Sequence, residues 1–274
     1  MVMYFDGEKP YEVDEKELLY QTKLDLWQTG FGLQAVDGLK PSDYMLHLAK
    51  ENIEGKKSYQ EVAADITKYH DSENINQATK EADIVSLRIA ELLSEDYFLL
   101  KPSTLLGIHR HLFTDVFEEY PVGQFRVVNI TKNEEVLNGE SVQYASHFMI
   151  RDTLNFDFSE EQDFSFEGLS QVAVAKHIMD FISNIWQVHP FREGNTRTIA
   201  VFAIKYFKSL GFDIDNEPFK KHSQYFRDAL VLANATGKLK TQTYLAKFTE
   251  NVLLAGENIL ERSEMLSRLN KTAE

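Results

Sequence analysis

The run from His189 to Arg197 brings together side chains that suit phosphate chemistry. It reads His189–Pro190–Phe191–Arg192–Glu193–Gly194–Asn195–Thr196–Arg197. An imidazole titrates near neutral pH, so His189 can act as a general base. The Glu193 carboxylate is a hard oxygen ligand of the kind that Mg²⁺ shares with phosphates. A base, a carboxylate and an arginine this close together predict a phosphate-transfer site.

The backbone of this run is predicted to form a loop between two helices. Pro190 disfavours helical geometry at His189, so the preceding helix should end there. Gly194 permits a tight turn or the close approach of a ligand, and Asn195–Thr196 can cap the next helix. The free N–H groups of that helix would point into the loop and bind an anion. Arg197 in the first turn is unfavourable against the helix dipole unless an anion lies nearby.

Helical periodicity over most of the chain predicts a mainly α fold. We expect the first helix over 14–28 to end at Gly30–Phe31–Gly32, and a capping box to start another at Ser58 and Glu61. Residues 155–167 are acidic and interrupted by Phe, which predicts a loop, and 125–137 read as a small β-hairpin. The other expected helices cover about 41–53, 78–93, 103–116, 170–187 and 195–210.

Composition narrows the classes of function. The 274 residues include 43 acidic and 29 basic side chains, for a net charge of −14, which argues against direct nucleic-acid binding. Residues 189–250 nevertheless carry 10 basic and 6 acidic side chains, and a locally positive window can attract an anionic ligand. The chain has no cysteine, no basic leader and no long apolar run, so we expect a cytoplasmic protein without a membrane span.

The run resembles the signature of the Fic family, His-Pro-Phe-x-Asp/Glu-Gly-Asn-Gly-Arg-x-x-Arg. Two further segments resemble that family: residues 122–133 are similar to its flap, and 223–230 are similar to a later helix beside the nucleotide. The resemblance covers roughly residues 80–255 and implies a Fic fold, a helical bundle with a small β-hairpin flap. The matching signature positions are His189, Pro190, Phe191, Glu193, Gly194, Asn195 and Arg197.

The resemblance implies transfer of AMP from ATP to a Ser, Thr or Tyr hydroxyl of a target protein that docks on the flap, 126–137. In that reaction His189 is the general base, Glu193 holds Mg²⁺, and Arg197 stabilises the departing pyrophosphate. Gly194, Asn195 and Thr196 would line the phosphate hole. The other residues that the resemblance places at the nucleotide are Arg192, Lys132, Asn133 and Tyr225.

Two positions depart from the signature. Thr196 stands where the family has Gly, and Ala200 stands where it has a second arginine that orients the γ-phosphate. These departures keep two alternatives open: a diverged Fic-fold module that binds a nucleotide or partner, or an enzyme that uses a different nucleotide donor.

The N-terminal region, residues 1–75, resembles the small helical antitoxin module of this family, joined to a catalytic core over 76–274. The inhibitory motif of that module is Ser/Thr-x-x-x-Glu followed by Gly or Asn. Its nearest counterparts here are Asp37, four residues after Leu33, and Glu54, four residues after Lys50, and neither has the hydroxyl. From the sequence we hypothesise that the N-terminal helices serve mainly for packing or target selection. Dimers are common in that family, so the resemblance is also compatible with a homodimer.

Overall fold

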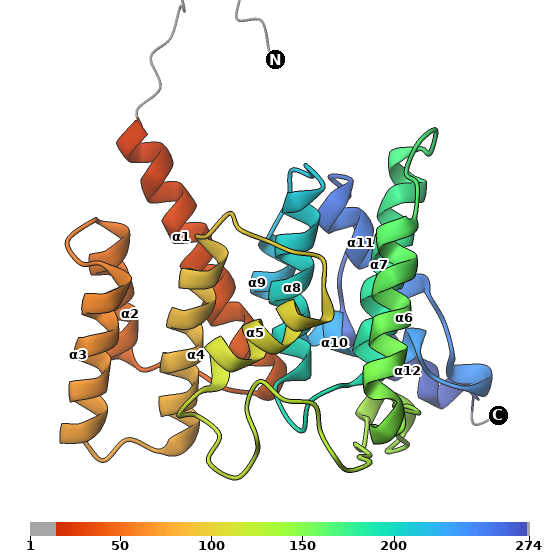
Figure 1. Cartoon of the computed structure of the whole chain (residues 1–274), viewed down its shortest axis with the longest axis horizontal. Helices are drawn as coiled ribbons and strands as arrows, with labels where there is room; N and C mark the ends of the chain where they lie inside the picture. Colours follow the sequence, from red (N-terminus) through yellow and green to blue (C-terminus); the bar gives the residue numbers. More distant parts are fainter. Residues whose placement is uncertain (1–14, 273–274) are drawn as a thin grey trace, which may run out of the picture.

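Helices form the regular structure of residues 15–272, the part of the chain that the computed structural model describes (Figure 1). The mainly α fold is therefore confirmed, and the predicted capping box at Ser58 and Glu61 is present at the start of α3. The α-helices are α1 Glu15–Gln34, α2 Asp43–Ile53, α3 Tyr59–Ser72, α4 Gln77–Leu93, α5 Pro102–Phe113, α6 Ile150–Asp163, α7 Gln171–Val188, α8 Asn195–Ser209, α9 Glu217–Lys221, α10 Ser223–Ala233, α11 Thr243–Leu253 and α12 Arg262–Thr272. Short 3-10 helices are η1 Ala35–Asp37, η2 Glu135–Leu137, η3 His147–Met149 and η4 Gly237–Leu239.

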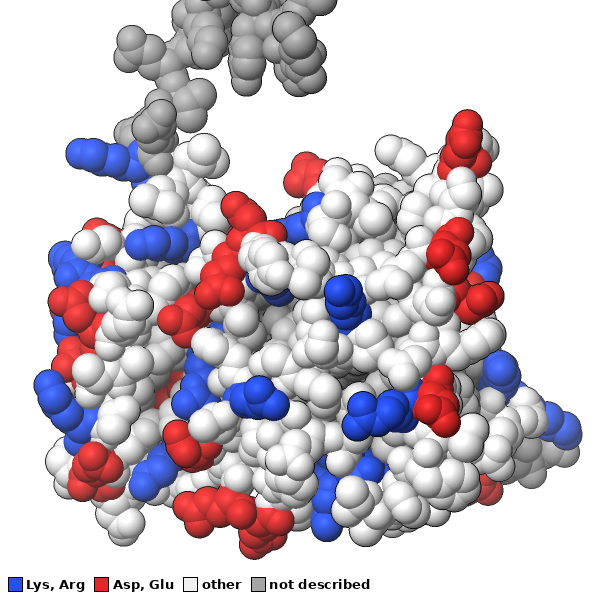
Figure 2. Space-filling view, in the orientation of Figure 1, with Lys and Arg blue, Asp and Glu red and all other residues white. Residues whose placement is uncertain are grey.

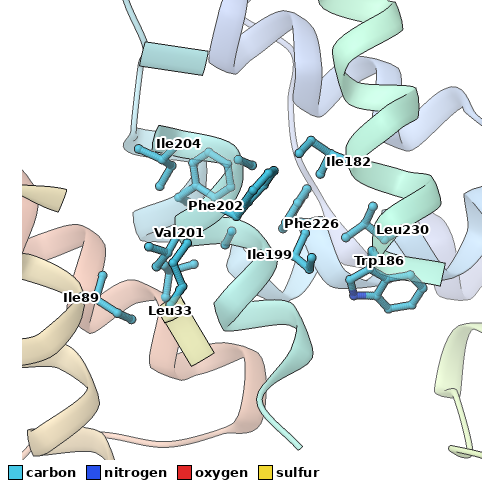
Figure 3. Close-up of a cluster of buried hydrophobic side chains, with 14 of the residues drawn as sticks. Leu33, Ile89, Ile182, Trp186, Ile199, Val201, Phe202, Ile204, Phe226 and Leu230 are labelled. Atoms are coloured by element: carbon cyan, nitrogen blue, oxygen red, sulfur yellow. The ribbon is translucent and has the colours of Figure 1, made fainter. Parts of the chain in front are cut away.

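Helix α8 is the centre of the bundle. Its side chains from Asn195 to Phe207 are all buried, because apolar residues occur on every side of it and no face can remain in water. It contacts α1, α4, α5 and α7. Figure 3 shows Ile199, Val201 and Phe202 of this helix among apolar side chains of the surrounding helices. The amino end of α8 carries the predicted chemical residues, so the whole core positions them.

Helix α1 does not end at Gly30–Phe31–Gly32, and that prediction is wrong. The helix continues to Gln34, and the two glycines serve as close-packing positions instead. A Cβ on Gly30 would lie 2.6 Å from the Ser86 carbonyl oxygen of α4, and one on Gly32 would lie 2.1 Å from the Lys220 carbonyl oxygen of α9. Helix α1 thus lies directly against α4 and α9, and η1, which follows it, brings Asp37 to Arg197 in the first turn of α8. Residues 1–14 of the predicted N-terminal region lie outside the described residues.

Two further predictions of local structure are wrong. Residues 150–163, most of which overlap the expected acidic loop, form α6, because Ile150, Leu154 and Phe158 recur at four-residue intervals and are buried. The segment 125–137 contains no β-strand. The chain turns instead over η2, where Asn138 and Gly139 have positive φ values of 56° and 86° and the Glu134 N–H bonds the Glu140 carbonyl. We call residues 125–142 the flap loop.

Charged side chains are mixed over the face drawn in Figure 2. Lys and Arg alternate there with Asp and Glu, and no large basic patch gathers on this face. Across residues 15–272, every helix is too short or too polar to cross a bilayer.

The close approach of α1 to α4 predicts a stability difference between two glycine positions. Gly30→Ala should lower the free energy of unfolding by about 1–3 kcal/mol, because the new methyl group overlaps the Ser86 carbonyl. Gly107→Ala in α5, where a Cβ meets nothing within 4 Å, should raise stability by up to about 1 kcal/mol. Urea unfolding of both variants measures this difference, and equal midpoints would contradict the packing role of Gly30.

Candidate active site

His189 lies between the end of α7 and the loop of residues 190–194 that precedes α8. It adopts a left-handed conformation, φ 50°, which ends α7 one residue before Pro190 as the sequence predicts. Its Nδ1 lies 3.3 Å from the Trp186 carbonyl oxygen, so we assign the ring proton to Nδ1. The lone pair is then on Nε2. Tyr144 stacks on the ring with a centroid distance of 4.1 Å and fixes its plane.

Burial keeps the His189 imidazole neutral. The ring is 8% exposed, and this burial lowers the pKa of His189 to about 3, with the positive charges of Lys132, Arg126 and Arg227 adding to the effect. At neutral pH the ring is therefore a proton acceptor, the state that a general base requires.

Gly194 caps α8, and this corrects the predicted cap at Asn195–Thr196. Gly194 has φ 73°, and a Cβ there would lie 2.4 Å from the Phe113 ring, so glycine is required for both reasons. The Asn195 side chain instead closes the loop: Oδ1 accepts from the Phe191 N–H and Nδ2 donates to the Phe191 carbonyl, both at 2.9 Å. The amides of the first turn of α8 have no intrahelical acceptor, an arrangement that suits an anion.

Thr196 has a structural partner. The Trp186 indole Nε1–H donates to Thr196 Oγ1 at 3.0 Å, and both side chains are buried. Trp186 also contacts the His189 ring edge to face at 5.2 Å. The threonine that departs from the Fic signature therefore positions a ring beside His189.

Glu193 is held in place from its backbone. Its carbonyl lies 3.1 Å from His109 Nε2, while His109 Nδ1 accepts from the Gly123 N–H at 2.9 Å, which assigns the proton to Nε2. Burial lowers the pKa of His109 to about 4, so this tautomer remains neutral. His109 was not predicted to belong to the site, because it lies 84 residues from Glu193 in the chain.

Arg197 is buried and contacts residues of α1, η1 and α4. It is 1% exposed. Nη1 donates to Gln34 at 3.1 Å, Nη2 donates to Glu81 at 2.6 Å, and Nε lies 2.9 Å from Asp37 Oδ2. The Nε–H is not aligned with any hydrogen-bond acceptor in the part of the chain that the structure describes. The contact with Asp37 is thus an ion pair that leaves a buried donor unsatisfied.

A cavity connects most of these groups, and its enclosed space is only about 10 Å³. A single water molecule needs about that much room, so the site is nearly closed in this conformation. Its lining residues are Asp37, Lys132, Glu134, Trp186, His189, Glu193, Asn195, Thr196 and Arg227.

The remaining predicted site residues lie elsewhere. Arg192 stacks on Tyr120 at 4.5 Å, and Asn133 is exposed on the flap loop. Tyr225 is buried between Tyr244 and Phe248 in the core, where burial raises its pKa. Glu54 pairs with Lys50 and Lys56 on the surface of α2. Of the two candidate inhibitory residues, only Asp37 lines the cavity.

Arg126 joins the flap loop to the motif. It is buried without a carboxylate partner among its hydrogen bonds, and it donates instead to the carbonyls of His189, Val188, Val128 and Ala145. Its own N–H bonds the Pro190 carbonyl at 2.8 Å. Because the carbonyls of Val188, His189 and Pro190 are among these acceptors, Arg126 fixes the backbone at His189.

A family comparison agrees with this geometry. Residues 99–207, from the approach to α5 through most of α8, match the model of the Fic/DOC family. The chain carries a Fic/DOC domain. The matched segment includes the flap loop and the whole His189–Arg197 run, whereas Asp37 and Arg227 lie outside it.

Several known proteins are similar to this chain. A probable protein adenylyltransferase, y4lH of Sinorhizobium fredii, is 32% identical over 131 residues, which are 46% of this chain and 60% of that relative. Two crystal structures have the same fold. BepC of Bartonella tribocorum with bound AMPPNP has a TM-score of 0.51 and 19% identity, covering 64% of this chain and 85% of that one. A Fic-domain signalling protein of Bacteroides thetaiotaomicron has a TM-score of 0.54 and 15% identity, covering 89% and 86%.

The buried imidazole of the Fic/DOC domain predicts a pH dependence of stability. The pKa of His189 is about 3 in the folded chain and 6.5 for an unperturbed histidine, so below pH 6.5 the unfolded chain takes up the proton first. This contribution to stability is complete above pH 6.5 and is lost as the pH falls towards 3, by about 1.4 kcal/mol per pH unit. Urea unfolding between pH 7.5 and 4.5 should show a shallower loss for His189→Gln than for the wild type. Identical slopes would contradict the burial of a neutral imidazole.

Proposed function

We propose that this protein is a protein adenylyltransferase that transfers AMP from ATP to a Ser, Thr or Tyr hydroxyl of a target protein. The observation that carries the proposal is the placement of a neutral imidazole, His189, beside the amino end of α8 and the carboxylate of Glu193. The similarity to a probable protein adenylyltransferase and to BepC with bound AMPPNP supports the same class of reaction.

The chemistry requires one proton transfer and one displacement. His189 Nε2 accepts the proton of the target hydroxyl while its oxygen attacks the α-phosphorus of ATP. The bond from the α-phosphorus to the bridging oxygen breaks, and pyrophosphate leaves with that electron pair. The amides of the first turn of α8 and the Arg197 guanidinium stabilise negative charge on the phosphates.

Glu193 suits a magnesium ion that arrives with the nucleotide. Its carboxylate lines the cavity, and no cluster of three His, Cys, Asp or Glu side chains that could hold a metal occurs between residues 15 and 272. Mg²⁺ is commonly bound through one or two carboxylates together with substrate phosphates and water. When bound, it would neutralise phosphate charge, and Glu193 is the residue that would hold it.

The flap loop supplies the docking place for the target in this proposal. Val127 is 74% exposed and lies next to Arg126, whose guanidinium contacts the His189 carbonyl. An extended target segment that bonds to exposed backbone here would bring its hydroxyl towards the base. Backbone pairing of this kind accepts many sequences, so the loop alone leaves the identity of the target open.

Labelling with ATP tests the proposed reaction. The protein is incubated with ATP labelled at the α-phosphate, Mg²⁺ and a cell lysate, and label on protein is measured. His189→Ala should reduce labelling at least about 100-fold, because it removes the base. His47→Ala is the matched control, since that imidazole is exposed on α2 and should leave labelling unchanged. Equal labelling by His189→Ala and the wild type would contradict the proposal.

Asp37 restrains the enzyme in this proposal, because it neutralises Arg197 from inside the cavity. This differs from our hypothesis that the N-terminal helices serve mainly for packing or target selection. Asp37→Asn should raise labelling about tenfold. The variant keeps the side-chain volume but loses the ion pair with Arg197, and a tenfold change corresponds to about 1.4 kcal/mol.

Glu54→Gln provides the comparison for Asp37→Asn. Glu54 pairs only with surface lysines of its own region, so this variant should label at the wild-type rate. No increase with Asp37→Asn would restore the packing hypothesis, whereas an increase with Glu54→Gln alone would assign the restraint to Glu54 instead of Asp37.

A further inference from the structure

An ion pair inside the cavity is not explained by the reaction described above. Arg227 of α10 donates through Nη2 to Glu134 Oε2 of the flap loop. The Glu134 side chain is 1% exposed and that of Arg227 is 15% exposed. Both line the cavity with His189, Glu193 and Thr196, although 93 residues separate them in the chain.

This pair is a poor choice for stability alone. Removing two charges from water costs several kcal/mol per ion, and the attraction between them repays that cost only with additional hydrogen bonds. Glu134 gains one such bond, from the Tyr144 hydroxyl at 3.3 Å, and burial still raises the pKa of its carboxyl group. The position of the pair beside the base therefore calls for a functional reason.

Arg227 is held so that it can exchange one anion for another. Its Nη1 lies 3.4 Å from Asp228 Oδ1, and Arg262 of α12 donates to the other oxygen of Asp228. Asp228 is itself buried, and Arg262 links it to Glu135 of the flap loop. Asp228 therefore gives Arg227 an anionic neighbour besides Glu134. Moving Glu134 would leave Arg227 anchored, with its guanidinium facing the cavity. A guanidinium binds phosphate oxygens in the same forked geometry as a carboxylate.

The charges in the cavity favour such an exchange. Its lining includes three carboxylates, of Asp37, Glu134 and Glu193, and two cations, of Lys132 and Arg227. The phosphates of an entering nucleotide need cations, and the carboxylates of the chain already neutralise the cations at this site. Asp37 lies on Arg197 and Glu134 lies on Arg227, so each acid occupies one guanidinium. Position 200 adds no cation, since Ala200 is fully buried in α8.

We propose that Arg227 is a phosphate-binding residue for the nucleotide, and that Glu134 of the flap loop occupies it until the nucleotide displaces the carboxylate. This assignment rests on the proposed function, because it takes the nucleotide of that reaction as the ligand. It adds a binding residue from α10, outside the His189–Arg197 run. It also makes the flap loop a competitor of the nucleotide, in addition to its proposed role towards the target.

Calorimetric titration of the full chain with ATP and Mg²⁺ tests the assignment. Glu134→Gln should tighten ATP binding about tenfold and Arg227→Gln should weaken it about tenfold or more, the range expected for one hydrogen bond to a charged group. Arg227→Lys should restore part of the affinity, because it retains the charge without the fork. Adenosine, which has no phosphate, should bind the Arg227→Gln variant and the wild type equally.

Glu135→Gln is the matched control for Glu134→Gln. Glu135 is the next residue of the same loop and also pairs with an arginine, Arg262, but its side chain is 64% exposed and lies outside the cavity lining. This variant should bind ATP as the wild type does. Thermal unfolding of each variant shows whether an affinity change arises from a loss of fold.

The outcomes separate this assignment from the proposed function. If ATP binds the wild type and neither Glu134→Gln nor Arg227→Gln changes the affinity, the assignment is overturned and the proposed function stands. If both variants weaken ATP binding alike, the pair is a structural support of the flap loop and the assignment is overturned as well. If ATP binds neither the wild type nor Asp37→Asn, the proposed function fails and the assignment fails with it.

Discussion

Arg197 carries a permanent positive charge at the amino end of a helix that is buried along most of its length. The charge and the helix dipole repel each other there, so the position requires anions close by. Gln34, Asp37 and Glu81 supply the polar partners, and they come from α1, η1 and α4. Neutralising one guanidinium therefore fixes the N-terminal helices against the core. The close contacts of Gly30 and Gly32 bring α1 near enough to α4 and α9 for this to happen.

The same requirement shapes the cavity. An anion is needed at Arg197 and another at Arg227, and carboxylates of the chain occupy both places. The base is neutral because it is buried under Tyr144 and beside three cations. The folded chain thus holds one neutral imidazole, His189, and two guanidinium groups, Arg197 and Arg227. Its own carboxylates neutralise both guanidinium groups. In the function proposed above, folding and the control of nucleotide entry depend on the same ion pairs.

Much of this could be predicted from the sequence wherever neighbours in the chain decide the structure. The end of α7 at His189 follows from Pro190, and the capping box at Ser58 follows from a residue three positions later. Pairing across the chain could not be predicted. Gly30 looks like a helix end until Ser86 is placed against it, and the pairing of Asp37 with Arg197 spans 160 positions. The flap loop has strand-forming residues, but its Arg126 bonds to the motif instead of a partner strand.

The hydrogen bond from Trp186 to Thr196 has a consequence for how this motif can change over time. Replacing the threonine with glycine would restore the common signature but leave a buried indole N–H without its acceptor, at a cost of about 1–3 kcal/mol. Replacing the tryptophan first would remove a ring from the side of His189. A change at either position alone therefore has a cost, so we expect Trp186 and Thr196 to change together. A lineage that acquired this pair would retain it even if glycine were the better residue for catalysis.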